Sequence, residues 1–246
     1  MDRNESALAI VIASTKVRNV DRLITLLSPV WGEVKVMVYG AQKSIKAVKA
    51  PLYTEGIFNL YHVREKNQFS LVDLTPLSIH EKISESFEAN LAASFISELV
   101  LLQRGTDSTS YFKLFTTTLD FLEDNNYYYK RALVQFILRY LNMAGFGSDF
   151  AFCPICQKPY ERNEVLGFYL DSTFPCCSKC DTMGGTFVLP PNARAYLRAS
   201  LLASFSQAME FVVSDIQIGR ILRYLVRLCE FCFDVHLKSI STGLLD

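Results

Sequence analysis

The sequence lacks the motifs that would assign a reaction at once. Its 246 residues contain no phosphate-binding glycine loop, no G-x-G-x-x-G dinucleotide fingerprint and no G-x-S-x-G nucleophile motif. Only three histidines are present, and none lies near residues 153–180, where four cysteines form two C-x-x-C pairs. A catalytic metal site that includes histidine is therefore not expected there. These absences predict a protein that is not an enzyme.

Long hydrophobic runs are missing as well, although half of the residues are hydrophobic. The richest stretch, residues 89–102, contains Asn90 and Glu98 and is shorter than the roughly 18 residues that a membrane span needs. Acids stand near the N-terminus, at Asp2 and Glu5, where a secretion signal carries bases. We therefore expect a cytoplasmic protein that does not contact membranes.

Seven cysteines all lie beyond residue 150, and the strongest pattern among them is two C-x-x-C pairs separated by twenty residues. The predicted ligands are Cys153, Cys156, Cys177 and Cys180, with Cys176 as an alternative to Cys177. A gap of two residues lets both sulfurs of a pair face one point, so that two pairs complete a tetrahedral Zn²⁺ site. Four thiolates leave no open position, so this zinc is expected to be structural.

A third C-x-x-C, Cys229 and Cys232, falls inside an apolar pattern of helical period. Residues three apart on a helix share a face, and leucines surround both positions. We expect these two cysteines to be buried as small hydrophobic side chains rather than to bind metal.

Five apolar segments in the first 76 residues predict β-strands. They cover residues 7–13, 23–27, 34–39, 52–63 and 69–74, with proline and glycine turn signals between them. Five short strands in a segment of this length favour a small closed barrel, because closure removes exposed strand edges, and the element count fits an OB-fold.

Beyond Pro76 the period changes to that of helices. Apolar residues recur every four positions from Ile79 to Leu99, which predicts a helix that ends near Gly105. Further helices are expected over 110–122 and 127–143, and two more between 192 and 233. The prediction is therefore an α+β fold: a nucleic-acid-binding OB-fold over residues 1–76, then a mostly helical domain over 77–246 with a four-cysteine zinc element at about 150–187.

Charge is unevenly distributed although the net charge is zero. Residues 16–49 hold seven bases against two acids. A polyanion responds to this local field, so the segment is a candidate DNA surface, with a solvated surface as the equally weighted alternative. The candidate contacts are Arg18, Arg22, Lys35, Lys43, Lys46 and Lys49. Aromatic residues that could stack on bases are Trp31, Tyr39, Tyr53 and Phe58, each of which is expected more strongly in the core.

A second basic series lies on the predicted C-terminal helices. It consists of Arg194, Arg198, Arg220, Arg223 and Arg227. The last three step by three and four positions and therefore share one helix face. This face is either a track for phosphates or an ordinary solvated surface.

Taken together, these features resemble RecO, a family of bacterial recombination mediators in DNA repair. The resemblance runs along nearly the whole chain, in the order of its motifs. It includes the segment Leu26-Leu27-Ser28-Pro29-Val30-Trp31-Gly32, the strand, glycine and basic turn at residues 36–44, the helical segment 95–99, Phe112 to Phe115, and a helix that stops at Gly145 shortly before the first C-x-x-C.

This resemblance implies an N-terminal OB-fold, a helical body and a four-cysteine zinc element. It implies binding of single- and double-stranded DNA, annealing of complementary strands, and work with RecR and the C-terminal tail of the single-strand binding protein SSB to help RecA load. It also implies a cytoplasmic, nucleoid-associated protein. The helix that carries Arg220, Arg223 and Arg227 is a candidate for the SSB tail, which needs an apolar groove rimmed by bases.

Two other classes compete with this interpretation. A protein-interaction scaffold with a structural zinc would keep its function after charge reversal at Lys43 and Lys46. A zinc hydrolase or nuclease would need an open metal position and catalytic side chains, and the sequence offers neither pattern.

Overall fold

The computed structural model of the chain describes residues 4–17, 19–41, 50–63, 68–102, 107–169 and 174–245. It contains two compact units, residues 1–126 and 127–246. The change from strands to helices falls close to the expected position, since the last strand of the first unit ends at Ser78. The first unit nevertheless continues for three helices beyond that strand. The division at 76/77 into a nucleic-acid-binding and a helical domain stays a prediction.

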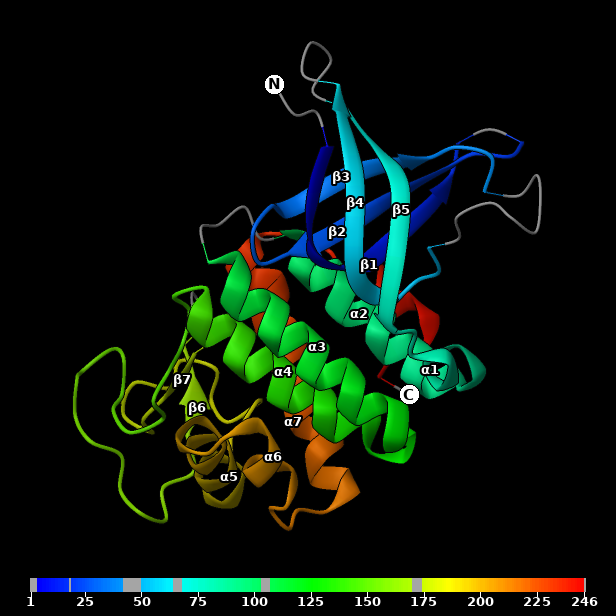
Figure 1. The fold of residues 1–246 in the computed structure, drawn as a ribbon. Helices are drawn as coiled ribbons and strands as arrows, with labels where there is room; N and C mark the ends of the chain where they lie inside the picture. Colours follow the sequence, from blue (N-terminus) through cyan, green and yellow to red (C-terminus); the bar gives the residue numbers. More distant parts are fainter. Residues whose placement is uncertain are drawn as a thin grey trace. The chain divides into compact units, whose positions relative to one another are not determined.

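The five predicted strands are all present in the first unit (Figure 1). They are β1 (Asn4–Lys16), β2 (Arg22–Ser28), β3 (Gly32–Val38), β4 (Glu55–Val63) and β5 (Gln68–Ser78). They close into a barrel in the order β1-β2-β3-β5-β4. Neighbouring strands pair antiparallel except at the closure, where Val36 and Met37 of β3 pair parallel with Phe69 and Ser70 of β5.

Apolar side chains from alternate positions along the strands fill the inside of the barrel. On β2, Ile24 and Leu26 are fully buried, and Val36 on β3 and Phe58 on β4 join them in one apolar cluster. Because side chains alternate between the two faces of a strand, the residues between these positions point away from this core. The barrel is therefore a filled core and not an open channel.

The four aromatic candidates divide between this core and the surface. Phe58 and Tyr53 are buried, and Trp31 packs against the apolar cluster. Tyr39, at 61% exposure, is the one of the four whose ring lies mostly in solvent. Tyr39 is therefore the aromatic residue of this set that is accessible to a base.

Helices α1 (Glu81–Glu85), α2 (Phe87–Leu102) and α3 (Ser108–Asp124) complete the first unit. The single helix expected from Ile79 onward is wrong in one respect, because it is broken at Ser86. Ser86 adopts an extended conformation, and its hydroxyl accepts a hydrogen bond from the N–H of Ala89 at 3.2 Å. A serine that caps the start of α2 in this way ends α1 after five residues.

His80 connects the barrel with these helices. Its side chain is 1% exposed, its Nδ1 donates to the Tyr53 carbonyl at 2.7 Å, and its Nε2 lies 3.0 Å from a carboxylate oxygen of Asp120 on α3. Tyr53 itself donates its N–H to Val11 on β1 at 2.8 Å. The histidine therefore fixes the segment that enters β4 against the third helix.

The second unit contains α4 (Tyr129–Met143), α5 (Pro191–Leu202), α6 (Phe205–Met209) and α7 (Asp215–Phe233), with short 3₁₀ helices η2 (Asn126–Tyr128) and η3 (Lys238–Thr242). Two helices were expected after residue 192, and the five-residue α6 is an addition. The predicted stop at Gly145 is confirmed: its φ is +84°, and Phe146 and Gly145 donate to the carbonyls of Leu141 and Asn142 in a Schellman cap.

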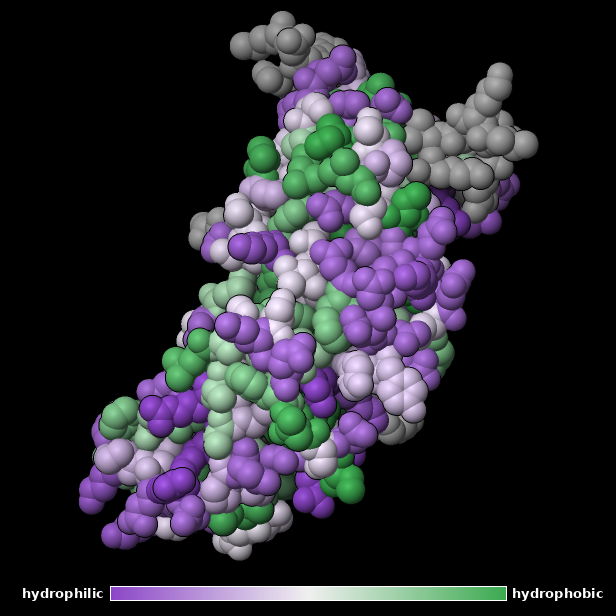
Figure 2. Space-filling view, turned by 60° about the horizontal axis from the view of Figure 1, so that its bottom comes forward, coloured by the Kyte–Doolittle hydropathy of each residue, from purple (hydrophilic) through white to green (hydrophobic). Residues whose placement is uncertain are grey.

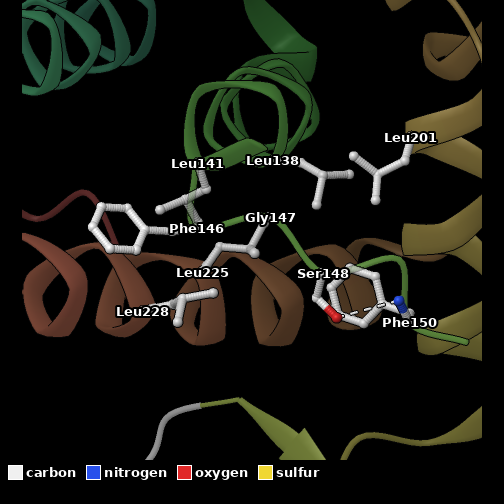
Figure 3. A pocket seen from close by; sticks show the side chains of 9 residues that line it. All are labelled: Leu138, Leu141, Phe146, Gly147, Ser148, Phe150, Leu201, Leu225 and Leu228. Carbon is white, nitrogen blue, oxygen red and sulfur yellow. Dashed lines mark hydrogen bonds between the residues drawn. The ribbon is translucent and has the colours of Figure 1, made fainter. Parts of the chain in front are cut away.

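The core of this unit lies between α4 and α7. A small cavity of about 10 Å³ lies here. Figure 3 shows that Leu138 and Leu141 of α4 and Leu225 and Leu228 of α7 line it, together with Leu201 of α5. Phe146 and Phe150 close it from the segment that follows α4. This segment leads directly into the first cysteine pair, so the predicted metal ligands begin at the edge of a packed core.

A buried polar network joins α4 to α5. The Gln135 amide donates to the Tyr196 hydroxyl at 2.7 Å and to the Ser200 hydroxyl at 3.0 Å. Arg139 donates to the Gln135 side-chain oxygen at 2.6 Å and to the carbonyls of Ser200 and Ala203 at the end of α5. Because each buried polar group here has a partner, the network fixes one register of the two helices.

The surface is mixed in polarity. On the face shown in Figure 2, small hydrophobic areas are separated by hydrophilic side chains over the coloured residues. Within the described ranges, no helix has the length and apolar character required to cross a bilayer.

Candidate metal centre and basic surfaces

Each cysteine pair is set in a tight turn. In the first, Cys153 donates its N–H to the Lys158 carbonyl and accepts from the N–H of Gln157, which has a left-handed φ of +60°, both at 2.9 Å. In the second, the N–H of Cys180 donates to the Cys177 carbonyl at 2.9 Å. These turns aim both sulfurs of a pair toward the same side.

The two turns bring the four predicted ligands together. The Sγ atoms of Cys153, Cys156, Cys177 and Cys180 all lie within 4.8 Å of one another, and those of Cys156 and Cys177 are 3.7 Å apart. Cys153 is buried while Cys156 is exposed, so the centre sits at the border of the fold. A group of four sulfurs at this spacing can hold a metal ion.

The choice between the two adjacent cysteines is decided by the fold. Cys177 belongs to the four-sulfur group, whereas Cys176 is fully buried on β7 (Pro175–Cys176), paired with β6 (Gly167–Phe168). Burial raises the pKa of the Cys176 thiol to about 11. Successive residues on a strand point to opposite sides, so only one of the two can face the centre.

The thiols of the centre differ in pKa. Burial alone would raise the pKa of Cys153, but the N–H groups of Cys156, Cys177 and Ile155 outweigh it and lower the pKa to about 7. The pKa of Cys180 is raised to about 12, first by its hydrogen bond to Cys177 and then by desolvation. A bound cation would lower the pKa of all four thiols, because it stabilises every thiolate at once.

Asp181, directly after the last ligand, shapes the loop behind the centre. Its carboxylate accepts from the N–H groups of Met183 and Gly185, both at 2.9 Å, and of Phe168 at 3.3 Å. The N–H of Met183 is the leading cause that lowers the pKa of Asp181. Gly167 lies so close that a Cβ there would be 2.3 Å from the Asp181 Cγ. The second cysteine pair therefore depends on a glycine thirteen residues upstream of its last ligand.

The third C-x-x-C is helical, as expected. Both cysteines lie on α7, with Cys229 fully buried and Cys232 partly buried. Burial is the leading cause that raises the pKa of each thiol, which keeps both protonated and unreactive.

The structure places only part of the predicted DNA surface. Arg18, Lys43, Lys46 and Lys49 lie outside the described residues. The segment that leads to the three lysines is anchored by the buried Asp21, whose carboxylate accepts from the N–H of Gly40 at 2.8 Å.

Arg22 and Lys35 are both exposed. The register of β2 and β3 places them on opposite faces of the strands, because Arg22 is paired with Val38 and Lys35 with Thr25. Lys35 alternates with the core residues Val36 and Val34 along β3 and is paired with Thr25 on β2. Arg22 begins β2 opposite Lys16 at the end of β1, and its guanidinium donates to the Ser14 hydroxyl at 3.3 Å. Arg22 and Lys16 therefore form the closer basic pair at this end of β1 and β2.

Within the second basic series, Arg194 is misassigned as a surface residue. It is 8% exposed and donates to the carbonyls of Glu161 and Arg162 at 2.6 and 2.9 Å. The spacing could not reveal this, because α5 turns this position toward the loop that follows the first cysteine pair. The other four arginines are exposed, and they are Arg198, Arg220, Arg223 and Arg227.

Three of these arginines border a groove that the sequence did not reveal. It has a volume of about 780 Å³ and lies between α7, the start of α5 and the loop after the second cysteine pair. Its apolar wall includes Phe168, Phe187 and Ile221, and the hydroxyl of Tyr224 is buried there without a hydrogen-bond partner. The arginines at its edge are Arg220, Arg223 and Arg227, and Arg227 also stacks on Phe187 at 5.3 Å. An apolar groove with a cationic rim suits a ligand that combines carboxylates with apolar groups.

Comparisons with known proteins match both parts of the chain. The family profile described as "Recombination protein O C terminal" matches residues 84–240. A protein named "DNA repair protein RecO" from Desulfitobacterium hafniense (strain DSM 10664 / DCB-2) is 24% identical over 249 residues, covering 96% of this chain and 87% of its own length. The protein of the same name from Clostridium novyi (strain NT) is 24% identical over 181 residues, covering 72% of this chain and 69% of its own.

Proposed function

The chain belongs to the RecO family of recombination proteins, and from this premise we propose that it mediates homologous recombination in DNA repair. In this role it binds DNA and anneals complementary strands without catalysing a covalent change. It acts in the cytoplasm at the nucleoid. The match over residues 84–240, together with relatives named for DNA repair, is the observation that carries the proposal.

The barrel is the proposed DNA-binding part, as an OB-fold. Five strands closed in the order β1-β2-β3-β5-β4, with a parallel contact only at the closure, support this assignment. Arg22 and Lys35 contact phosphates, joined by Arg18, Lys43, Lys46 and Lys49 from outside the described ranges. Each contact releases counterions, so affinity falls as salt rises.

Annealing follows from holding two strands at once. Two complementary strands held on the same protein lose their translational freedom in advance, so that pairing becomes a local event rather than an encounter in solution. Both single- and double-stranded DNA are ligands, since contacts to the sugar–phosphate backbone are independent of sequence.

The four-cysteine group is the proposed site of a structural Zn²⁺. The proposed ligands are Cys153, Cys156, Cys177 and Cys180, whose sulfurs lie within 4.8 Å of one another. They fit the ion because four thiolates are the donor set of closed, structural Zn²⁺ sites. When bound, the ion supplies a cross-link between the two turns and no open position for chemistry. The residues around it only orient the ligands, Asp181 by its backbone hydrogen bonds and Tyr160 by donating from its hydroxyl to the Pro175 carbonyl at 2.7 Å.

RecR and the C-terminal tail of SSB are the proposed protein partners, and through them the chain helps RecA load. The tail is acidic and ends in an aromatic residue, which matches the groove along α7. Its aromatic ring packs against the apolar wall near Phe168, while its carboxylates pair with Arg220 and Arg223. A concave apolar site favours this peptide over a phosphate track, which needs no apolar wall.

Strand annealing on SSB-coated single strands tests the proposal. The chain is expected to accelerate annealing of complementary strands, and charge reversal at Lys43 and Lys46 is expected to reduce both annealing and single-strand affinity. Charge reversal at Lys113, an exposed base of α3 outside the proposed surface, serves as the control. If the parent protein does not bind oligonucleotides at low ionic strength, the proposal is wrong, and a protein-interaction scaffold becomes the better interpretation.

A further inference from the structure

Arg194 presents an electrostatic problem. A guanidinium is charged at every physiological pH, and burying a charge is unfavourable unless an opposite charge compensates it. Arg194 is 8% exposed, yet among the described residues no carboxylate lies within ion-pair distance of it. One of its two terminal nitrogens, Nη2, donates to two carbonyls, while Nη1 is buried with no hydrogen-bond partner among the described residues.

Contacts through Tyr160 connect Arg194 with the segment that carries the second cysteine pair. The guanidinium lies 5.4 Å over the ring of Tyr160. The hydroxyl of that tyrosine donates to the carbonyl of Pro175, two residues before the ligand Cys177. Burial raises the pKa of Tyr160, and charge on Cys153, the first of the thiols, raises it further. Tyr160 therefore contacts the buried cation with its ring and, with its hydroxyl, the segment that leads into the second cysteine pair.

The centre itself needs a positive neighbour. Four thiolates bring four negative charges and a divalent cation returns two positive ones, so a loaded four-cysteine site keeps a net negative charge. Cys153 is fully buried, so part of this charge lies where water does not screen it. A buried cation nearby offsets this charge, and the charge in turn offsets the burial of the cation.

We propose that Arg194 is a positioning residue of the metal centre, whose charge compensates the four-thiolate group across the ring of Tyr160. This inference rests on the metal binding proposed above. It gives a reason for burying an arginine without a carboxylate partner, which its two carbonyl contacts alone do not provide. A purely structural Arg194 would only hold the turn at Glu161 and Arg162 against α5.

Cobalt binding to the full-length protein separates these two roles. The metal-free chain would be titrated with Co²⁺ in competition with a chelator, and the thiolate-to-cobalt absorption would report occupancy. Arg194→Gln keeps N–H donors but loses the charge, Arg194→Lys keeps the charge, and Arg198→Gln changes an exposed arginine one turn further along α5. The thermal midpoint of each metal-free variant would be measured alongside.

The expected result is a loss of Co²⁺ affinity of about 10- to 100-fold for Arg194→Gln, as for other residues that support metal ligands from behind. Arg194→Lys should retain most of the affinity and Arg198→Gln all of it. Equal losses in the glutamine and lysine variants, or an unchanged affinity in the glutamine variant, would overturn the proposal. So would an Arg194→Gln variant that fails to fold with and without metal. A parent chain that binds no Co²⁺ or Zn²⁺ would instead refute the proposed metal site.

Discussion

Replacing Gly167 with alanine should damage the metal centre without touching a ligand. An ideal Cβ at this buried position would lie 2.3 Å from the Cγ of Asp181 and 2.5 Å from its Oδ2. Ordinary contacts between carbon atoms begin near 3.5 Å, so the carboxylate has to move by roughly 1 Å. Asp181 accepts the N–H groups of Met183 and Gly185 at 2.9 Å each, and a shift of this size breaks that geometry.

Two magnitudes follow from this displacement. Forcing a methyl group into a packed site lowers the free energy of unfolding by about 1–3 kcal/mol. Because Asp181 is bonded directly to the ligand Cys180, its displacement also disturbs the second cysteine pair. Loss of a group that orients a metal ligand weakens metal affinity by about 10- to 100-fold.

Gly219→Ala is the matched control. Gly219 lies inside α7, and apart from its own helical turn no described atom lies within 4 Å of the position that an added methyl group would take. Alanine therefore removes backbone freedom without a clash and raises the free energy of unfolding by about 0.5–1 kcal/mol. The assay is Zn²⁺ or Co²⁺ affinity by chelator competition, with urea unfolding of the metal-loaded proteins. A Gly167→Ala protein that binds metal as tightly as Gly219→Ala would refute the assigned role of this glycine.

Three further predictions concern the barrel and the groove. Replacing Arg22 and Lys35 together by glutamine should lower the slope of log affinity against log salt by about 0.7 for each lost contact with single-stranded DNA, as measured by fluorescence anisotropy; an unchanged slope would exclude both from the interface. His80→Ala removes the hydrogen bond that the imidazole donates to the Tyr53 carbonyl. Urea unfolding should therefore show that the free energy of unfolding falls by about 1–3 kcal/mol. A loss below about 0.5 kcal/mol would contradict the role assigned to this histidine. Arg223→Glu should weaken binding of an acidic peptide with an aromatic C-terminus roughly five- to tenfold, more at low salt, whereas unaltered calorimetric affinity would place the peptide elsewhere.

Local patterns were sufficient to predict the five strands, the end of α4 and the four-cysteine group. Short apolar segments bounded by proline and glycine turn signals predicted all five strands, because a strand needs only a few consecutive residues to cover a core and ends where a turn begins. The spacing of Cys153, Cys156, Cys177 and Cys180 predicted the four-sulfur group, because a C-x-x-C turn closes over two residues whatever surrounds it. The stop at Gly145 was equally local, since a left-handed residue after a helix favours glycine.

Other features depend on contacts between distant segments and emerge only when the chain is folded. The periodicity that joined residues 79–105 into one helix carried no sign of the cap at Ser86. Arg194 was predicted as one more surface base because its partners, the carbonyls of Glu161 and Arg162, are more than thirty residues away in the chain.

The groove along α7 is the clearest case of this kind. Phe168, Phe187 and Arg223 belong to three separate segments, and none of them marks a site alone. A strand, a helix or a C-x-x-C turn is specified by neighbours within a few residues, so the order of amino acids is enough to predict these parts. A cavity or a buried charge depends on which remote side chains pack together, and this packing exists only in the folded chain.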